Sequence, residues 1–215
     1  MAALFNQEEF GKLKQYLVMY RCALSNMRMR VETLYEDFSH LQPYNPIEHI
    51  KDRVKSAESI AAKLARRNSP LTAENARVTL MDIAGIRCIC SYSKDVYVVA
   101  DALKRQPDTK ILNEKDYVTF PKGSGYRSYH LIVEVPVYLS DSTEYLPVEV
   151  QIRTQAMDFW ASLEHKVRYK YNNFIPETLA SELVDCAEKI DELDKRMYLV
   201  QEIADLVSSI KPRET

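Results

Sequence analysis

The chain has 215 residues with a formal net charge of −2, and its 46% hydrophobic and 28% charged residues are ordinary values for a globular protein. These values exclude a disordered or collagen-like chain and a nucleic-acid binder driven by net positive charge, while they leave room for a local RNA-binding patch. No apolar run approaches the roughly 20 residues of a membrane span, and residues 1–10 lack the regions of a signal peptide. We therefore expect a cytoplasmic protein without membrane contact.

The four cysteines, Cys22, Cys88, Cys90 and Cys186, predict neither a disulfide nor a metal site. Cys88 and Cys90 are close in sequence, but alternate residues of a strand share a face without reaching disulfide geometry. The chain also lacks a Cys-x-x-Cys pair and a paired-histidine motif. We expect buried, reduced thiols.

The first third of the chain predicts helices. Residues 7–38 carry apolar side chains at roughly helical spacing, which indicates one long helix or a helix pair. Prolines and an asparagine between residues 40 and 46 end it. Residues 47–67 then predict a further helix, because apolar residues recur every three or four positions at Ile50, Val54, Ala57, Ile60 and Leu64. A short helical segment is expected before residue 80.

The hydrophobic period then changes to that of strands. In chain order, the sequence predicts strand 86–92, helix 96–104, a weak strand 110–118, strands 129–137 and 146–153 with a turn at Ser140–Ser142 between them, helix 154–171 broken at Asn172 and Asn173, and a long helix 176–210. The expected fold class is α+β, with a small mixed β-sheet of the nucleotidyltransferase-like type, flanking helices, and long N- and C-terminal helices.

Basic residues crowd the predicted helix 47–67. Lys63 has Arg66 and Arg67 as neighbours three and four positions on, and like charges this close destabilise a helix. With Arg53 and Lys55 they form either a solvated helix face or a site for a triphosphate.

Three further segments carry polar residues in patterns typical of a nucleotide site. Asp82, Gly85 and Arg87 surround the start of a strand, where they indicate a metal and phosphate site or a turn with a surface ion pair. The loop 122–130 holds two of the four glycines together with residues suited to phosphates and a base, although its spacing is not that of a Walker loop. In the last strand, alternation puts Glu149, Gln151 and Arg153 on one face, which indicates a cleft or a solvated surface.

Together these segments resemble the synthetase domain of the RelA/SpoT family. The resemblance rests on Arg53–Lys55, Asp82–Arg87, Gly125–His130, Glu149–Thr154 and Ala156–His165, which occur in the family's order. It implies a synthetase domain at residues 45–172, an N-terminal helical extension at 1–44 and a C-terminal helix for oligomerisation at 173–215. The family's hydrolase and regulatory domains have no counterpart here, so we expect a stand-alone small alarmone synthetase.

The resemblance implies a GTP/GDP pyrophosphokinase of the stringent response. Such an enzyme moves the β,γ-pyrophosphate of ATP to the ribose 3′-hydroxyl of GDP or GTP and yields AMP and ppGpp or pppGpp. Five residues are expected to bind ATP, two around the adenine and three at the phosphates: Arg53 and Arg87, then Lys55, Lys63 and Arg66. Mg²⁺ is expected on Asp82 and Glu149, with Glu149 also taking the 3′-hydroxyl proton and Gln151 orienting the site.

The acceptor site is expected to use residues of the loop and of the following helix. By resemblance, Tyr126 stacks on the guanine, Lys122 and His130 meet acceptor phosphates with Arg127, and Asp158 contacts the guanine. Some family members have Asn where this chain has Asp158, so the choice among GMP, GDP and GTP stays open. In one branch a product molecule binds between subunits at positions that read His49 and Lys51 here, and we do not expect that regulation.

Alternatives remain for both assembly and function. A homotetramer is expected by resemblance and because two long helices present apolar stripes that one small sheet cannot cover; the alternative is a monomer in which these helices cover each other. A catalytically degenerate nucleotide- or RNA-binding regulator, or a relative that pyrophosphorylates adenine nucleotides or tRNA, are the alternatives to alarmone synthesis.

Overall fold

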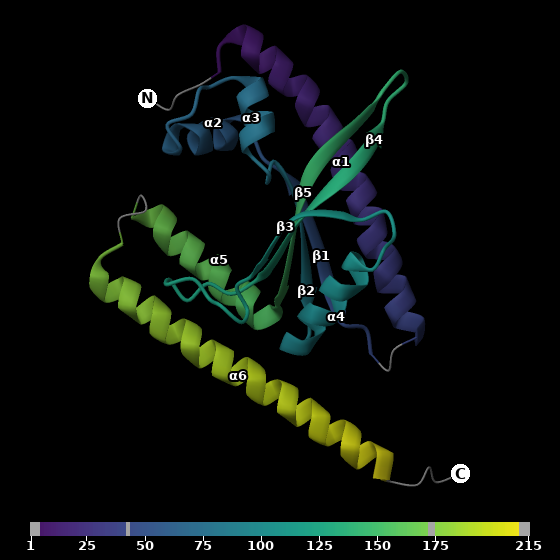
Figure 1. Ribbon diagram of the computed structural model, residues 1–215. Coiled ribbons are helices and arrows are strands. Elements are labelled where there is room, and N and C mark those ends of the chain that lie inside the picture. Colours follow the sequence, from purple (N-terminus) through teal and green to yellow (C-terminus); the bar gives the residue numbers. More distant parts are fainter. Residues whose placement is uncertain (1–4, 42–43, 172–174, 211–215) are drawn as a thin grey trace.

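The structure is a computed structural model that describes residues 5–41, 44–171 and 175–210. In chain order its helices and strands are α1 (Gln7–Leu41), β1 (Ile47–Val54), α2 (Ala57–Arg66), α3 (Ala73–Thr79), β2 (Ala84–Cys90), α4 (Ser93–Lys104), β3 (Lys110–Asp116), β4 (Tyr129–Tyr138), β5 (Thr143–Thr154), α5 (Gln155–Lys170) and α6 (Glu177–Ile210). Figure 1 shows the two long helices, α1 and α6, on opposite sides of the sheet. The predicted breaks at Asn172 and Asn173 lie outside the described residues, as does the side chain of Ile210.

Within the described residues, the strands form one five-stranded sheet in the order β1-β2-β5-β4-β3. Strands β2 and β5 pair in parallel, and the other neighbours pair antiparallel. The predicted α+β class with a small mixed sheet, flanking helices and two long terminal helices is therefore confirmed. No helix in the described ranges is long and apolar enough to cross a membrane.

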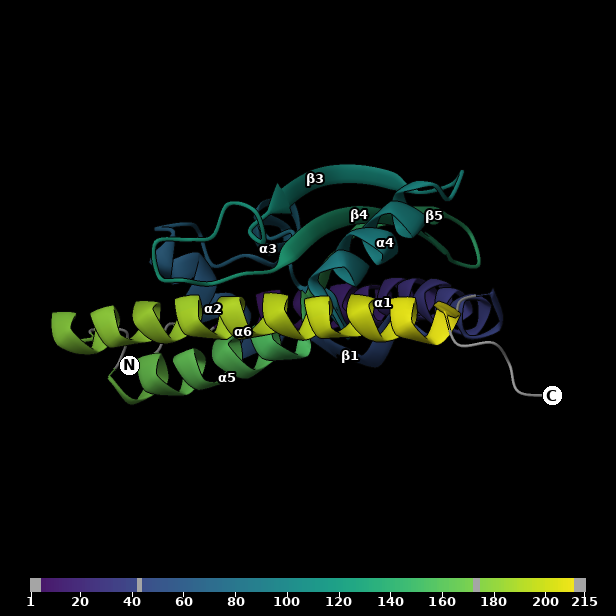
Figure 2. The same cartoon turned by 90° about the horizontal axis from the view of Figure 1, so that it is seen from below.

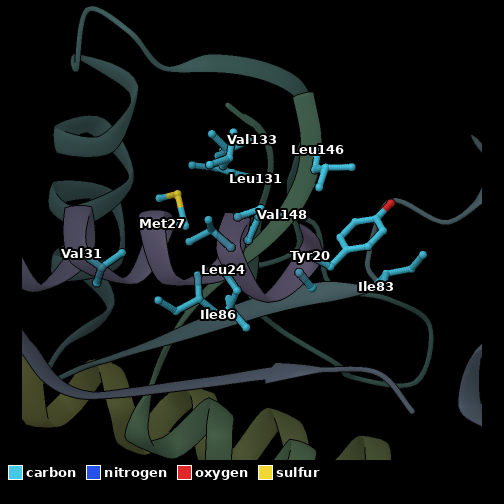
Figure 3. Close-up of a cluster of buried hydrophobic side chains, with 14 of the residues drawn as sticks. Tyr20, Leu24, Met27, Val31, Ile83, Ile86, Leu131, Val133, Leu146 and Val148 are labelled. Atoms are coloured by element: carbon cyan, nitrogen blue, oxygen red, sulfur yellow. The ribbon is translucent and has the colours of Figure 1, made fainter. Parts of the chain in front are cut away.

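Helix α1 packs along one face of the sheet and shares its core. Leu24, Met27 and Val31 are buried with strand residues such as Ile86 and Val148, and Figure 3 shows this cluster. Burial of each large apolar side chain contributes about 1.5–3 kcal/mol. The stripe of α1 that was expected to need a partner subunit is thus covered by the chain's own sheet, together with α4.

The sequence prediction of a helix over residues 47–67 is wrong for its first half, which forms strand β1. A register irregularity between Ile47 and His49 brings Ile47 and Ile50 opposite Cys90 and Cys88, on the same face. Ile50 and Val54, on which the helix prediction rested, lie four positions apart, and residues an even number of positions apart also share a face of a strand, so this pair fits either period. Backbone pairing with β2 outweighs the local pattern. The helix itself begins at Ala57, where Ser56 accepts a hydrogen bond from the Ser59 amide.

The thiol prediction holds for two cysteines only. Cys88 and Cys90 are buried free thiols on β2, and burial raises the pKa of Cys88 to about 12. Cys22 and Cys186 are free but exposed on the long helices, so their predicted burial is wrong.

Helix α6 runs beside α5 and continues past it toward α4, as the view in Figure 2 shows. Its first half is anchored by contacts to α5 and the segment before it: Trp160 donates to the Leu183 carbonyl at 2.9 Å, and Thr154 donates to Asp194 at 2.8 Å. The loop before β4 also meets α6, because Gly125 lies against Ala187 with a φ of +86°. This glycine is needed for helix packing, whereas the sequence suggested only close approach to a ligand.

We predict that Gly125→Ala destabilises the protein by about 2 kcal/mol, which lowers Tm by roughly 4–8 °C, because of the left-handed backbone and a steric clash. A Cβ atom at this position would lie 2.5 Å from the Ala187 Cβ. Thermal unfolding followed by circular dichroism measures the change. Gly123→Ala is the matched control, since a Cβ there has no neighbour within 4 Å. Equal Tm values for the two variants would contradict this packing.

Candidate active site

The sheet face opposite α1 carries two rows of polar residues. Strand register aligns one row across four strands, Lys51, Arg87, Gln151 and His130, and a second row across three, Arg53, Gly85 and Glu149. Their alternation with core residues places all these positions on the same face. Gly85 adds no side chain between Arg53 and Glu149. Many of these residues line a pocket of about 210 Å³ that also includes Lys55 and Asp82.

Asp82 lies at the edge of this pocket and accepts from two lysines. Lys55 Nζ is 2.8 Å from Asp82 Oδ2 and 2.6 Å from its carbonyl oxygen, and Lys63 Nζ also donates to Oδ2. Burial works to raise the pKa of Asp82, but the hydrogen bonds from Lys55 and Lys63 outweigh it and hold that pKa below its usual range. The carboxylate therefore stays ionised at neutral pH.

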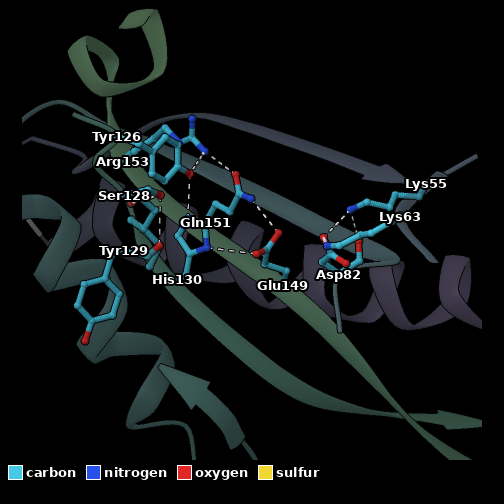
Figure 4. A network of polar contacts seen from close by, with 11 residues as sticks. Lys55, Lys63, Asp82, Tyr126, Ser128, Tyr129, His130, Glu149, Gln151 and Arg153 are labelled. Carbon is cyan, nitrogen blue, oxygen red and sulfur yellow. Dashed lines mark hydrogen bonds and ion pairs between the residues drawn. The ribbon is translucent and has the colours of Figure 1, made fainter. Parts of the chain in front are cut away.

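Glu149 belongs to a closed ring of hydrogen bonds, which Figure 4 shows beside Asp82. His130 Nδ1 is 3.1 Å from Glu149 Oε1, and Gln151 Nε2 donates to Glu149 Oε2 at 2.8 Å. His130 Nε2 is 2.9 Å from the Tyr126 hydroxyl. Arg153 Nη2 closes the ring by donating to that hydroxyl at 2.9 Å and to Gln151 Oε1.

The electrostatics of Glu149 favour its ionised form. Burial acts to raise the pKa of Glu149, whereas hydrogen bonds from His130 and Gln151 lower it, and the net shift is downward. Each carboxylate oxygen keeps a further lone pair, so the ionised and oriented Glu149 can accept a proton as a general base.

Asp158, at the start of α5, lies among cations rather than free in the pocket. Its Oδ1 is 2.8 Å from Arg87 Nη1 and 3.5 Å from Arg153 Nη1, and its Oδ2 is 3.5 Å from Lys51 Nζ. Thr154 caps α5 by accepting from the Met157 amide, which fixes the first turn that carries Asp158. Asp158, on the helix that follows β5, therefore holds the side chain of Arg87 in place.

The loop before β4 brings Lys122 and Tyr126 together, as predicted for the acceptor site, but directs Arg127 away from them. Lys122 Nζ lies over the rings of Tyr117 and Tyr126, 4.6 and 4.9 Å from their centroids. Arg127, expected at a phosphate, points instead to α6, with its Nε 3.2 Å from Asp191 Oδ1.

The donor residues expected on one helix come from separate elements. Arg53 is exposed on β1, Lys55 follows that strand, and Lys63 and Arg66 lie on α2. Lys55 and Lys63 meet at Asp82, whereas Arg66 is exposed and makes no contact with that carboxylate. The carboxylate of Asp82 therefore reduces the repulsion between Lys55 and Lys63, two members of the predicted like-charge cluster.

Sequence reasoning missed one residue of the ring, Arg153. Its position in the alternation Glu149, Gln151, Arg153 places it on the polar face, and that signal was available. Its burial was not, because α5 covers the end of β5 where Arg153 lies, and the residue is 2% exposed.

The two carboxylates suit a magnesium ion held jointly with a phosphate ligand. Asp82 Oδ1 is buried and receives no hydrogen bond from the described residues. The described residues contain no cluster of three or more potential ligands among His, Cys, Asp and Glu. Mg²⁺ binds through one or two carboxylates plus substrate phosphates and waters, so Asp82 and Glu149 fit such an ion.

Comparisons with known proteins agree with this chemistry. A family model described as the region found in RelA / SpoT proteins matches residues 52–174. The chain is 44% identical to the GTP pyrophosphokinase YwaC of Bacillus subtilis (strain 168) over 89% of this chain and 91% of that protein.

Two solved structures of one Bacillus subtilis protein also match. The small alarmone synthetase 1 bound to its product pppGpp has a TM-score of 0.82 and 34% identity, covering 88% of this chain and 96% of that chain. The same synthetase bound to AMPCPP has a TM-score of 0.77 and 32% identity, covering 89% and 97%.

We predict that Lys63→Met increases the affinity of the nucleotide-free protein for Mn²⁺ roughly tenfold, equivalent to about 1.4 kcal/mol, because one competing ammonium group leaves Asp82. Electron paramagnetic resonance of free Mn²⁺ measures the binding. Arg66→Met removes a charge from the same helix without touching Asp82 and serves as the control. Unchanged affinity in Lys63→Met would show that the lysine does not compete for this carboxylate.

Proposed function

The chain belongs to the RelA/SpoT family, and we propose that it is an alarmone synthetase that transfers the β,γ-pyrophosphate of ATP to the ribose 3′-hydroxyl of GDP or GTP. The products are AMP and ppGpp or pppGpp. The observation that carries this proposal is the pair of ionised carboxylates, Asp82 and Glu149, in one pocket with cations on both sides. The relatives named as GTP pyrophosphokinase and alarmone synthetase support it.

The donor side lies between β1 and α2. Arg53 and Arg87 are diagonal neighbours on the same face of paired strands and flank the pocket, which suits guanidinium planes on either side of an adenine. When ATP binds, Lys55 and Lys63 would release Asp82 and donate to the donor phosphates instead. Arg66 is exposed on the same helix and would meet the phosphate chain from outside.

The acceptor side lies toward β4 and α5. The Tyr126 ring offers a face for guanine, and Lys122, which lies over that ring, would move to the acceptor phosphates. Both nitrogens of His130 are engaged, so its contact with a phosphate requires release of Tyr126 or Glu149. Asp158 can accept from the guanine N1 and N2 donors. Arg127 would reach a phosphate only by leaving Asp191.

Catalysis would rest on positioning and charge, because phosphoryl-type transfer requires little covalent work from the protein. Glu149 takes the proton from the 3′-hydroxyl, and Gln151 and His130 hold its two oxygens in place. Mg²⁺, held by Asp82 and Glu149, would neutralise charge on the donor phosphates.

The alternatives fit this site less well. A binding protein that had lost catalysis could afford to lose Asp82 or Glu149, yet both carboxylates are present and line the pocket. An adenine nucleotide or tRNA acceptor would place a different base against Tyr126, and only the assay below separates those acceptors.

The assay incubates the protein with ATP, Mg²⁺ and one acceptor at a time, GMP, GDP, GTP, AMP or uncharged tRNA, and resolves the products by anion exchange. We expect AMP together with a guanosine 3′-pyrophosphate from GDP or GTP. Product from AMP or tRNA alone would replace the proposed acceptor, and no product with any acceptor would overturn the enzyme.

We predict that Glu149→Gln lowers the initial rate by about 10²-fold or more, because general-base catalysis typically contributes that factor. Gln keeps the size of the side chain and one oxygen but cannot take the proton. ATP binding, measured by isothermal titration, should persist through the cations of the donor side. A rate within tenfold of the wild type would remove Glu149 as the base.

The enzyme is further proposed to be a cytoplasmic homotetramer. Up to residue 207, where the described side chains end, the later half of α6 exposes seven large apolar side chains by 49% to 61%: Leu193, Met197, Leu199, Val200, Ile203, Leu206 and Val207. An apolar surface of this length supports subunit association. Because α1 is covered by the sheet, α6 rather than α1 would supply the interface.

We predict a mass near 100 kDa by multi-angle light scattering, about four times the 24.9 kDa chain. Replacing Met197 and Val200 with Glu should dissociate the assembly, because it introduces charge into the exposed stripe. A wild-type mass near 25 kDa would overturn the oligomer.

A further inference from the structure

Arg153 carries a positive charge inside the protein, and its ion pair with Asp158 is long and shared with Arg87. It is 2% exposed, and its nearest carboxylate oxygen, Asp158 Oδ1, lies 3.5 Å away and is also 2.8 Å from Arg87. Burial lowers the pKa of Arg153. Removing a guanidinium from water costs several kcal/mol, which neutral hydrogen-bond acceptors only partly offset. A buried charge in this position therefore calls for a reason other than stability.

The two protons of Arg153 Nη2 are directed at two neighbours. One neighbour is the Tyr126 hydroxyl, at 2.9 Å, and the other is Gln151 Oε1. A guanidinium has donors only and no acceptor, so both contacts have a fixed direction. Arg153 thus determines which way each of these side chains is oriented.

Two chains of hydrogen bonds connect Arg153 to Glu149, one through Tyr126 and His130 and one through Gln151, and the direction of donation at Arg153 extends along both. With its oxygen accepting from Arg153, the Tyr126 hydroxyl can donate to His130 Nε2 in the tautomer whose Nδ1–H donates to Glu149 Oε1. On the other branch, Gln151 accepts from Arg153 at its oxygen, so its amide nitrogen faces Glu149 Oε2. Since an ionised carboxylate accepts only, both ends of the ring require the same direction.

We infer that Arg153 is a positioning residue that aligns Tyr126, His130 and Gln151 so that both carboxylate oxygens of Glu149 receive a hydrogen bond. Arg153 is 2% exposed and is not among the residues that line the pocket, so it would act through these side chains rather than on substrate. Arg153 thereby orients both Glu149, the proposed base, and Tyr126, the residue proposed to stack on the guanine of the acceptor. This inference rests on the proposed pyrophosphate transfer.

The test measures kcat and both KM values for Arg153→Ala. We expect kcat to fall about 10²-fold, since small misplacements of catalytic groups cost this much. The acceptor KM should rise with it, while the ATP KM changes little. Guanidinium ion at millimolar concentration should enter the space that is left and restore kcat at least severalfold, whereas methylammonium should not.

Arg77→Ala is the matched control. Arg77 is a half-buried arginine whose Nη2 is 2.6 Å from Glu144 Oε2, away from the pocket, so guanidinium should leave its kcat unchanged. Arg153→Lys keeps the charge, but its single ammonium group cannot reproduce the planar geometry, so its kcat should also fall at least about tenfold.

The outcomes separate the two proposals. A wild type that makes no 3′-pyrophosphate overturns the proposed function and this inference with it. If the wild type is active and the kcat of Arg153→Lys or Arg153→Ala equals that of the wild type, the inference alone is overturned. A folded Arg153→Ala whose kcat guanidinium does not restore also overturns the inference alone. If Arg153→Ala fails to fold, the Lys variant decides; failure of both to fold assigns Arg153 to stability and overturns the inference.

Discussion

Strands β2 and β5 pair in parallel, with Gly85 opposite Glu149 and Arg87 opposite Gln151. This register brings together two segments that lie more than sixty positions apart in the chain, because the crossover between them contains α4, β3 and β4. A shift of one residue would turn Glu149 and Gln151 into the apolar core and Val148 and Val150 out of it. The core under α1 therefore holds the polar face in register.

The candidate site holds more cations than carboxylates, and carboxylates of the chain hold several of those cations before any nucleotide binds. Asp82 holds Lys55 and Lys63, and Asp158 holds Arg87 with Lys51 nearby. Such pairs keep several like charges close together at little cost in stability. Under the proposed function, nucleotide binding would be an exchange of partners, in which Lys55 and Lys63 turn to phosphates and Asp82 becomes free to hold a divalent cation.

The parts of the fold that follow one simple period could be predicted from the sequence. Strands β4 and β5 alternate cleanly, and α1 has a helical stripe, so their existence and approximate bounds were predicted correctly. Strand β1 was missed because Ile50 and Val54, four positions apart, fit a helical and a strand period equally well. Motifs pointed to polar residues that the structure brings to one face of the sheet, but they could not show that Lys63 and Lys55 share one carboxylate. Nor could they show the burial of Arg153, because both facts depend on contacts between distant segments.

The loop that carries Tyr126 and helix α6 are attached to each other through Gly125 against Ala187 and through Arg127 with Asp191. A nucleotide that displaces this loop must work against the helix, and a partner that holds the helix reduces the entropy lost when the loop is ordered. Thermodynamic reciprocity makes the two effects equal in free energy. Under the proposed function, the coupling free energy between acceptor binding and subunit association would be the same whichever of the two is measured.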